Sequence, residues 1–132
     1  RRLVTAAISI EGLTKVYGVP ILCGEATRAA VPDLVWREID RVRVKGRASA
    51  VSIFEPLAEA GDAPAQARAS RWEAALGLYH AQRFDEARAA FDAIAQDAAD
   101  HALATLFATR CVTFAAAPPE PDWDGAWNFL AK

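Results

Sequence analysis

Residues 35–56 read VWREIDRVRVKGRASAVSIFEP, and they predict two β-strands joined by a tight turn. Side-chain types alternate over residues 35–44 as in a strand, and residues 50–56 return as a second strand. The Lys45-Gly46-Arg47 turn between them completes a β-hairpin. A strand over residues 35–44 would place Trp36, Glu38, Asp40, Val42 and Val44 on one face, and Val35, Arg37, Ile39, Arg41 and Arg43 on the other. This alternation is imperfect, so we expect one face to be only partly dry.

Three further elements are predicted upstream of this hairpin. Apolar residues recur with a helical period over residues 4–17, and this helix is expected to stop at Gly18. Residues 19–23 form a short apolar run between glycines, which suits a buried strand. Residues 25–31 predict a short helix that Pro32 ends.

Downstream of the hairpin, apolar residues recur with a helical period, so this part is predicted to be helical throughout. The predicted helices cover residues 71–82, 85–96 and 101–114, and a last short element covers residues 122–130. The apolar stripes expected to form a core are Trp72, Ala75, Leu76 and Tyr79, then Ala87, Ala90, Phe91 and Ile94, then Leu103, Leu106, Phe107 and Val112, and finally Trp123, Trp127 and Leu130.

Alanine content and charge divide the chain near residue 57. Residues 1–57 hold 7 of the 31 alanines and carry a net charge of +3, whereas residues 58–132 hold the other 24 and carry −5. Between them, residues 59–64 (EAGDAP) are small and polar and contain Gly and Pro, as a linker does. The predicted fold class is α+β, with a first part over 1–57, a linker over 58–70 and an α-helical tail over 71–132.

Overall composition argues against several classes of protein. A net charge of −2 and a pI of about 5.7 disfavour a nucleic-acid binder driven by bulk charge. No apolar run approaches the roughly 18 residues of a membrane span, so no membrane segment is expected. Cys23 and Cys111 lack metal-ligand spacing, and we expect reduced core thiols of a cytoplasmic protein. Because the chain contains no methionine, we expect a fragment or a processed product.

One segment is more specific than its periodicity. EGLTKVYGVPIL (residues 11–22), followed by GEAT (24–27) and VRVKGR (42–47), resembles the C-terminal part of the class III nucleotidyl (adenylate/guanylate) cyclase catalytic domain. Order and spacing agree over residues 4–57, about two fifths of the chain. In that family a helix with the pattern Asn-x-x-x-Arg-x-Glu precedes a strand, a short helix and a closing hairpin with a Lys-Gly turn. The resemblance implies a partial ferredoxin-like cyclase sheet.

The same resemblance implies a metal-dependent lyase that converts ATP into 3′,5′-cyclic AMP and pyrophosphate. Sites of the family lie at a dimer interface, where one subunit supplies two Asp that hold two Mg or Mn ions. The other subunit supplies the Asn, which orients the ribose, and the Arg, which neutralises charge in the transition state. The resemblance therefore implies that the parent enzyme uses ATP with Mg or Mn and acts as a homodimer or oligomer. Some members of the family are anchored to a membrane through an N-terminal region.

When the family's catalytic residues are matched to positions of this sequence, the match fails at the residues that catalysis needs. Glu11 retains the Glu of the pattern, but the Arg falls on Ser9 and the Asn falls on Thr5. Serine supplies no fixed positive charge, and loss of such a group commonly costs orders of magnitude in rate. The metal-binding Asp residues of the family lie upstream of position 1. Lys45 matches a basic position that can contact the terminal phosphates of the substrate, and its other interpretation is an ordinary solvated turn lysine.

Two explanations of Thr5 and Ser9 stay open. In the first, residues 1–10 are out of register with the family because of a sequencing or frame error at a fragment end. In the second, the chain is a degenerate cyclase half that only pairs with or regulates another subunit. Under either explanation the chain alone lacks the family's metal site, so we predict no cyclase activity from it.

The tail carries a second resemblance. RFDEA (residues 83–87), with Phe91 four positions later, is similar to the turn and second helix of a tetratricopeptide-type helix pair, in which Ala75 takes the small position of the first helix. Similar helical tails follow the catalytic domain of some bacterial cyclases, often with a segment like PPEPDWDG (118–125). The alternative function is a non-catalytic module whose tail binds a protein through an Ala/Phe groove and whose hairpin mediates dimerisation.

Overall fold

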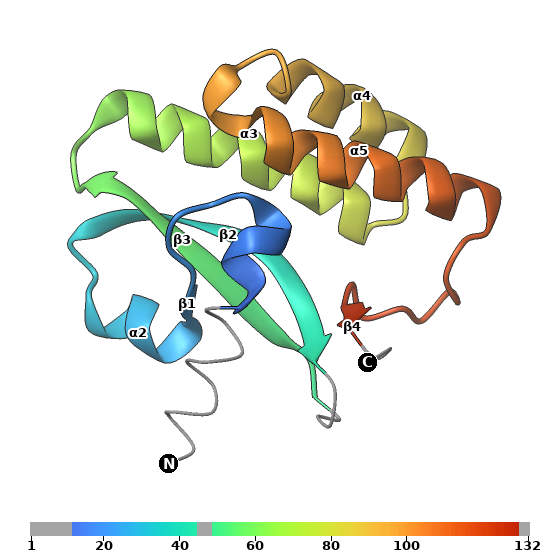
Figure 1. Cartoon of the computed structure of the whole chain (residues 1–132), viewed down its shortest axis with the longest axis horizontal. Coiled ribbons are helices and arrows are strands. Elements are labelled where there is room, and N and C mark those ends of the chain that lie inside the picture. Colours follow the sequence, from blue (N-terminus) through green and yellow to red (C-terminus); the bar gives the residue numbers. More distant parts are fainter. Residues whose placement is uncertain (1–11, 45–48, 130–132) are drawn as a thin grey trace. The chain divides into compact units, whose positions relative to one another are not determined.

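The computed structural model describes residues 12–44 and 49–129 and confirms the predicted α+β class (Figure 1). It divides into two compact units, Arg1–Ala69 with Ala126–Lys132, and Ser70–Gly125, which we call the sheet unit and the helical unit. Residues 12–17 are helical. The elements that follow are β1 (Cys23–Gly24), α2 (Glu25–Ala30), β2 (Leu34–Val44), β3 (Val51–Glu59), α3 (Ala63–His80), α4 (Phe84–Ile94), the 3-10 helix η1 (Ala98–Asp100), α5 (His101–Ala116) and β4 (Trp127–Phe129).

The described part of the sheet unit contains a four-stranded sheet with the order β1-β3-β2-β4. β2 and β3 pair antiparallel from Leu34 opposite Glu59 to Val42 opposite Val51, which confirms the predicted hairpin. β1 pairs antiparallel with β3, and β4 pairs parallel with β2. Of the strand predicted over 19–23, only Cys23 lies in β1, which continues to Gly24, while Pro20, which has no N–H for a ladder, lies outside it.

A β-bulge in β2 overturns the predicted alternation of its side chains. Glu38 lies opposite Phe54 and Asp40 lies opposite Ile53, so Ile39 is an extra residue between two paired positions. An extra residue reverses the alternation beyond it, and the prediction that Asp40 lies on the face opposite Arg37 is therefore wrong. The buried side chains of this face of β2 include Arg37, Asp40 and Val42.

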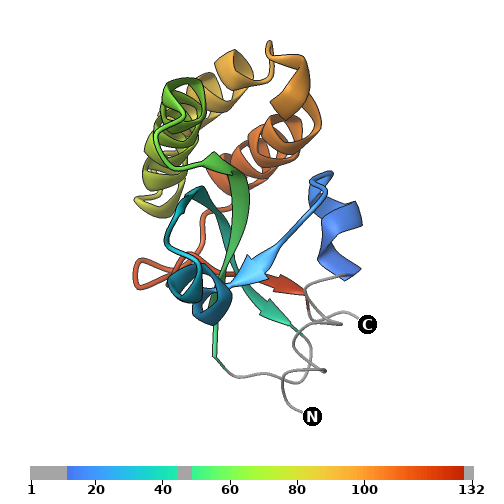
Figure 2. The same cartoon turned by 90° about the vertical axis from the view of Figure 1, so that its left-hand side faces the viewer.

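Two helical segments cover opposite faces of the sheet (Figure 2). The segment 12–17 reaches the bulged face through Tyr17 and ends, as predicted, at Gly18, whose φ of 68° suits glycine. α2 lies on the other face, where the Arg28 guanidinium carbon is 5.0 Å from the ring centroid of Phe54. The predicted short helix is thus confirmed, and each face of the hairpin has its own cover.

Residues 58–70 do not form the predicted linker. β3 continues to Glu59, and α3 begins four residues later. The first turns of α3 pack Ala65 and Ala69 against Val35 in the sheet unit, with Leu57 and Ala58 at the edge of the same cluster. The boundary between the two units therefore falls inside α3, after Ala69.

The Gly and Pro residues of this stretch have a different role from the predicted one. Gly61, with a φ of 94°, makes the turn that leaves β3. Asp62 then caps α3, since its Oδ1 accepts the backbone N–H of Ala65 at 2.9 Å. Pro64 stands in the first turn of the helix, where a missing N–H costs no hydrogen bond. These residues mark a strand-to-helix turn.

The core of the helical unit follows most of the predicted stripes, although Ala90 and Leu106 are only half-buried. Trp72 is fully buried, and its ring centroid lies 5.0 Å from those of both Phe91 and Phe107. Such aromatic pairs add to the free energy gained by burying their area. Val112, expected in the core, is 49% exposed because α5 turns Cys111, one position earlier, inward.

The chain returns to the sheet unit at Ala126, so the prediction of a wholly helical tail over 71–132 is wrong at its end. Residues 127–129 form β4 beside β2. Trp123 stays in the helical unit, where its ring lies 5.4 Å from that of Tyr79, as a core anchor should. The helical unit is therefore inserted in the sequence between β3 and β4.

Candidate functional site

The three positions selected by the cyclase resemblance, Thr5, Ser9 and Lys45, lie outside the described residues, as do Glu11 and Leu130. The structure describes the segments that flank them. Residues 12–17 follow Glu11 directly, and β2 ends one residue before Lys45. The contacts of these flanking segments are the part of the candidate site that has a described geometry.

Tyr17 and Asp40 join the helical segment 12–17 to the sheet. The Tyr17 hydroxyl donates to Asp40 Oδ2 at 2.6 Å, and both side chains are buried. Asp40 Oδ1 accepts the backbone N–H of Arg41 at 2.8 Å. A buried carboxylate is costly unless donors reach its oxygens, and here a donor reaches both of them. The bulge at Ile39 makes this contact possible, because it turns Asp40 toward Tyr17.

An ion pair buried in the sheet unit crosses the hairpin. Arg37 Nε and Nη2 donate to Glu55 Oε1 at 3.0 and 2.8 Å, and the two side chains are 0% and 5% exposed. The register of the strands sets this geometry, since Arg37 and Glu55 lie directly opposite each other. Such a pair adds little net stability, but loss of one partner leaves a buried charge uncompensated. We interpret the pair as a device that fixes the register of the hairpin.

β4 contacts both flanking segments of the candidate site. Trp127 pairs with Val42 at the end of β2, and Arg43 Nη1 donates to Asn128 Oδ1 at 2.7 Å. The ring of Phe129 lies edge-on to that of Tyr17, with 6.3 Å between centroids. One short strand therefore braces the helical segment that follows Ser9 and the strand that precedes Lys45.

The buried acids of the sheet unit do not fit a metal centre. Over residues 12–44 and 49–129, no three His, Cys, Asp or Glu side chains form a group that could hold a metal ion. Asp40 and Glu55 already accept hydrogen bonds from Tyr17 and Arg37, whereas Mg²⁺ or Mn²⁺ needs several available oxygen ligands. Mg or Mn as cofactor stays a prediction from the resemblance.

Neither cysteine is a candidate nucleophile. Cys23 and Cys111 are both free thiols. Burial raises the pKa of Cys23, and it raises the pKa of Cys111 to about 11 despite the nearby Arg110. A thiol with so high a pKa is protonated near neutral pH, so Cys111 supplies almost no thiolate.

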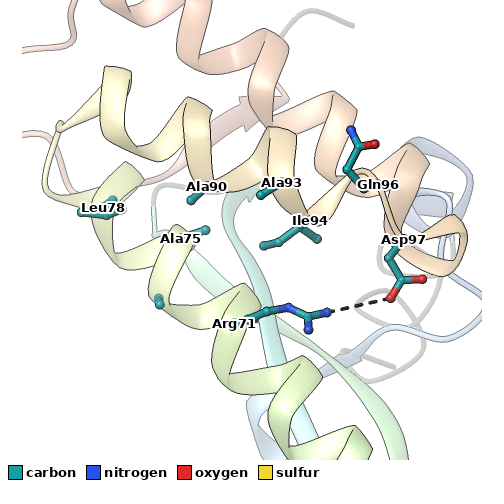
Figure 3. Close-up of a pocket in the computed structure, with 9 residues that line it drawn as sticks. Arg71, Ala75, Leu78, Ala90, Ala93, Ile94, Gln96 and Asp97 are labelled. Atoms are coloured by element: carbon teal, nitrogen blue, oxygen red, sulfur yellow. Dashed lines mark ion pairs between the residues drawn. The ribbon is translucent and has the colours of Figure 1, made fainter.

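The helical unit carries a groove between α3 and α4, with a volume of about 590 Å³ (Figure 3). Ala75 and Ile94, both buried, form its floor, and small alanines keep its sides low. At one end the Arg71 guanidinium and the Asp97 carboxylate lie 3.8 Å apart. The lining residues are Arg71, Ala74, Ala75, Leu78, Ala90, Ala93, Ile94, Gln96 and Asp97.

This groove differs from the predicted Ala/Phe groove in its chemistry. Phe91 is fully buried in the core of the helical unit, where it contacts Trp72, so it cannot line a binding surface. The charged end formed by Arg71 and Asp97 was not predicted. A signal for it exists in the sequence, because Arg71 and Leu78 share one face of α3, and Asp97 follows Ala90, Ala93 and Ile94 at helical spacing.

No family model, curated protein or solved structure with which the chain was compared matches it. Across the described part of the chain, none of the helices has the length and apolar character needed to cross a membrane.

Proposed function

We propose that this chain is the C-terminal part of a class III nucleotidyl cyclase domain followed by a tetratricopeptide-like helical unit. The parent enzyme converts ATP into 3′,5′-cyclic AMP and pyrophosphate in the cytoplasm, as a homodimer or oligomer. One observation carries the proposal. The helical segment 12–17, β1, α2 and the β2–β3 hairpin follow one another in the order that the resemblance implies.

The motifs behind the resemblance coincide with the ends of these elements. Gly18 ends the helical segment, and Gly24 is the N-cap of α2, whose first residue is Glu25. Lys45 and Gly46 fall between the two strands of the hairpin. This coincidence supports the proposal, because a chance match of letters has no reason to respect element boundaries.

The residues of this chain would act mainly as positioning groups. Lys45 would contact the terminal phosphates of ATP as a point charge. Thr5 and Ser9 occupy the positions of the family's Asn and Arg, and a serine hydroxyl cannot neutralise charge that develops at phosphorus. The Tyr17–Asp40 contact holds the segment that follows Ser9. The Mg or Mn ions of the parent would supply Lewis-acid stabilisation of the phosphates.

A chimera tests the proposal. Residues 11–57 replace the matching part of an active class III cyclase domain that keeps its own metal-binding Asp residues and its own Asn and Arg. We expect cyclic AMP from ATP and Mn²⁺, a loss of about tenfold or more in the Lys45→Ala version, and no loss in Lys15→Ala, an exposed lysine. A chimera that is folded by circular dichroism and dimeric by sedimentation, yet forms no cyclic AMP, contradicts the proposal.

A second chimera addresses Thr5 and Ser9. It carries residues 1–57 and so replaces the recipient's Asn and Arg as well. We expect it to be inactive, and we expect the double substitution T5N/S9R to restore cyclic AMP formation. A double variant that folds but stays inactive would show that more than these two positions separates the chain from its family.

The second candidate function is a non-catalytic interaction module. The observation that favours it is the groove of the helical unit, whose floor is apolar and whose one end is charged. Under this alternative the residue 11–57 chimera is folded but inactive, while substitutions in the groove still change association of the chain with a protein partner.

A further inference from the structure

The groove between α3 and α4 presents the same kind of surface on both of its sides. α3 contributes Ala74 and Ala75, and α4 contributes Ala90 and Ala93. Alanine side chains let a neighbouring helix approach closely, because the distance between packed helices is set by the side chains at their contact. A pair of helices with the same small surface therefore fits this groove.

Charge at the groove is balanced, which distinguishes it from the rest of the helical unit. Residues 70–125 hold nine acidic and four basic side chains, so the unit as a whole would attract a basic partner. Of the side chains that line the groove, only Arg71 and Asp97 are charged, one of each sign. A partner that matches the groove therefore needs one positive and one negative side chain at the end where Arg71 and Asp97 lie.

We propose that this groove is an interface with a second copy of this chain. A two-fold axis along the groove places α3 of each copy against α4 of the other, as a self-complementary interface requires. Arg71 of one copy then faces Asp97 of the second copy, and the reverse. The two side chains suit this exchange, because they are 57% and 48% exposed and lie 3.8 Å apart within one copy (Figure 3).

Two charge reversals, R71D and D97R, test the interface in the full chain. Each places like charges in the groove of both copies, so each variant alone should dimerise about tenfold more weakly than the wild type. A mixture of the two variants pairs opposite charges again at both contacts. We expect sedimentation to show heterodimers in the mixture that neither variant forms with itself.

Matched controls change the same charges elsewhere on α4. Arg88 and Asp92 form an exposed pair with a closest approach of 3.6 Å, on the side of the helix away from Ala90 and Ala93. R88D and D92R should leave the dimer unchanged. Circular dichroism of all four variants checks that the helices remain folded. No activity measurement enters, and the charge reversals separate this interface from a dimer formed through the sheet unit.

Three results would overturn the proposal. The first is a wild-type chain that stays monomeric at every concentration reached in sedimentation. The second is a dimer that R71D and D97R do not weaken, which would place the contact in the sheet unit. The third is a monomeric chain that binds a Lys-rich amphipathic helical peptide in the groove, because the natural occupant would then be a basic helix.

Discussion

Asp40 joins two parts of the sheet unit from inside its core. Its carboxylate accepts hydrogen bonds from the Tyr17 hydroxyl at 2.6 Å and from the backbone of Arg41 at 2.8 Å. The contact with Tyr17 spans 23 residues of sequence, so it ties the helical segment to the hairpin. At the residue scale, this contact controls the position of the segment that follows Ser9.

Tyr17→Phe tests this contact. The substitution keeps the ring and removes the donor, which leaves one oxygen of a buried carboxylate without that hydrogen bond. We expect a loss of about 1 to 3 kcal/mol in the free energy of unfolding, measured by urea denaturation. Ser52→Ala is the control, because its hydrogen bond to Glu38 is only half-buried and should matter less. Equal losses in the two variants would contradict the role assigned to Tyr17.

The raised pKa of the Cys111 thiol predicts that the folded chain loses stability at alkaline pH. Its pKa is about 11 in the folded chain, against an ordinary value of 9.0, because burial disfavours the thiolate. Below pH 9 the thiol is protonated in both states, and between pH 9 and 11 it ionises first in the unfolded chain. The folded state should therefore lose about 2 to 3 kcal/mol as the pH rises through this window.

Urea denaturation at a series of pH values measures this effect. Cys111→Ala should be less stable at neutral pH, because it leaves a cavity, and should lose less stability between pH 9 and 11. Parallel stability curves for the wild type and Cys111→Ala would contradict the assignment.

At the scale of elements, Asp62 controls where α3 begins. Its Oδ1 accepts the N–H of Ala65 at 2.9 Å, one of the donors that the first turn of a helix cannot satisfy internally. The start of α3 also carries Ala65 and Ala69, which pack on Val35. A frayed first turn would therefore weaken the sheet unit as well as the helix.

Asp62→Ala should cost about 1 kcal/mol of stability, because alanine cannot cap the helix. Asp62→Asn is the matched control, since an asparagine side chain caps equally well and changes only the charge. Thermal unfolding followed by circular dichroism measures both variants. If both lost the same stability, charge rather than capping would be the cause.

Elements with local signals could be predicted from the sequence, and elements that depend on distant partners could not. The hairpin, the stop at Gly18 and the buried Trp72 follow from turn residues and periodicity within a few positions. The bulge at Ile39 leaves only a weak trace in the sequence, because the apolar positions change face between Ile39 and Val42 but one such change does not fix where a residue is inserted. β4 needs a partner strand far away in the sequence, and residues 58–70 have the composition of a linker although they contain a helix start.

The candidate site divides in the same way. Thr5, Ser9 and Lys45 come from a pattern shared with a family, and they stay predictions because they lie outside the described residues. The pairs Tyr17–Asp40 and Arg71–Asp97 join residues more than twenty positions apart, so periodicity alone cannot pair them. Only the fold brings these side chains together.

At the scale of the whole molecule, the sheet unit is built from two separate stretches of chain. Ala126 to Phe129 belong to it, although the whole helical unit precedes them in the sequence. β4 closes one edge of β2 and lays Phe129 against Tyr17. The sheet unit therefore depends on residues that a boundary near residue 57 would discard.

Truncation after Gly125 tests this dependence. It removes β4, and we expect faster amide hydrogen exchange at residues 41–43 of β2 and near Tyr17, with little change in α4 and α5. Truncation after Phe129 is the control, because it keeps β4. Unchanged exchange in β2 after the first truncation would contradict the bracing role of this strand.

The parallel pairing of β4 also sets an order of events during synthesis. Arg43 and Asn128, hydrogen-bonded across β2 and β4, are 85 positions apart, whereas the ring contacts of Trp72 with Phe91 and Phe107 in the helical unit span about 19 and 35 positions. Contacts between distant positions form slowly, because closing a long loop costs chain entropy. The helices should therefore form first. Until β4 has been synthesised and has paired, one edge of β2 in the hairpin stays uncovered. That temporary edge is where a nascent chain of this protein is most exposed to pairing with the wrong strand.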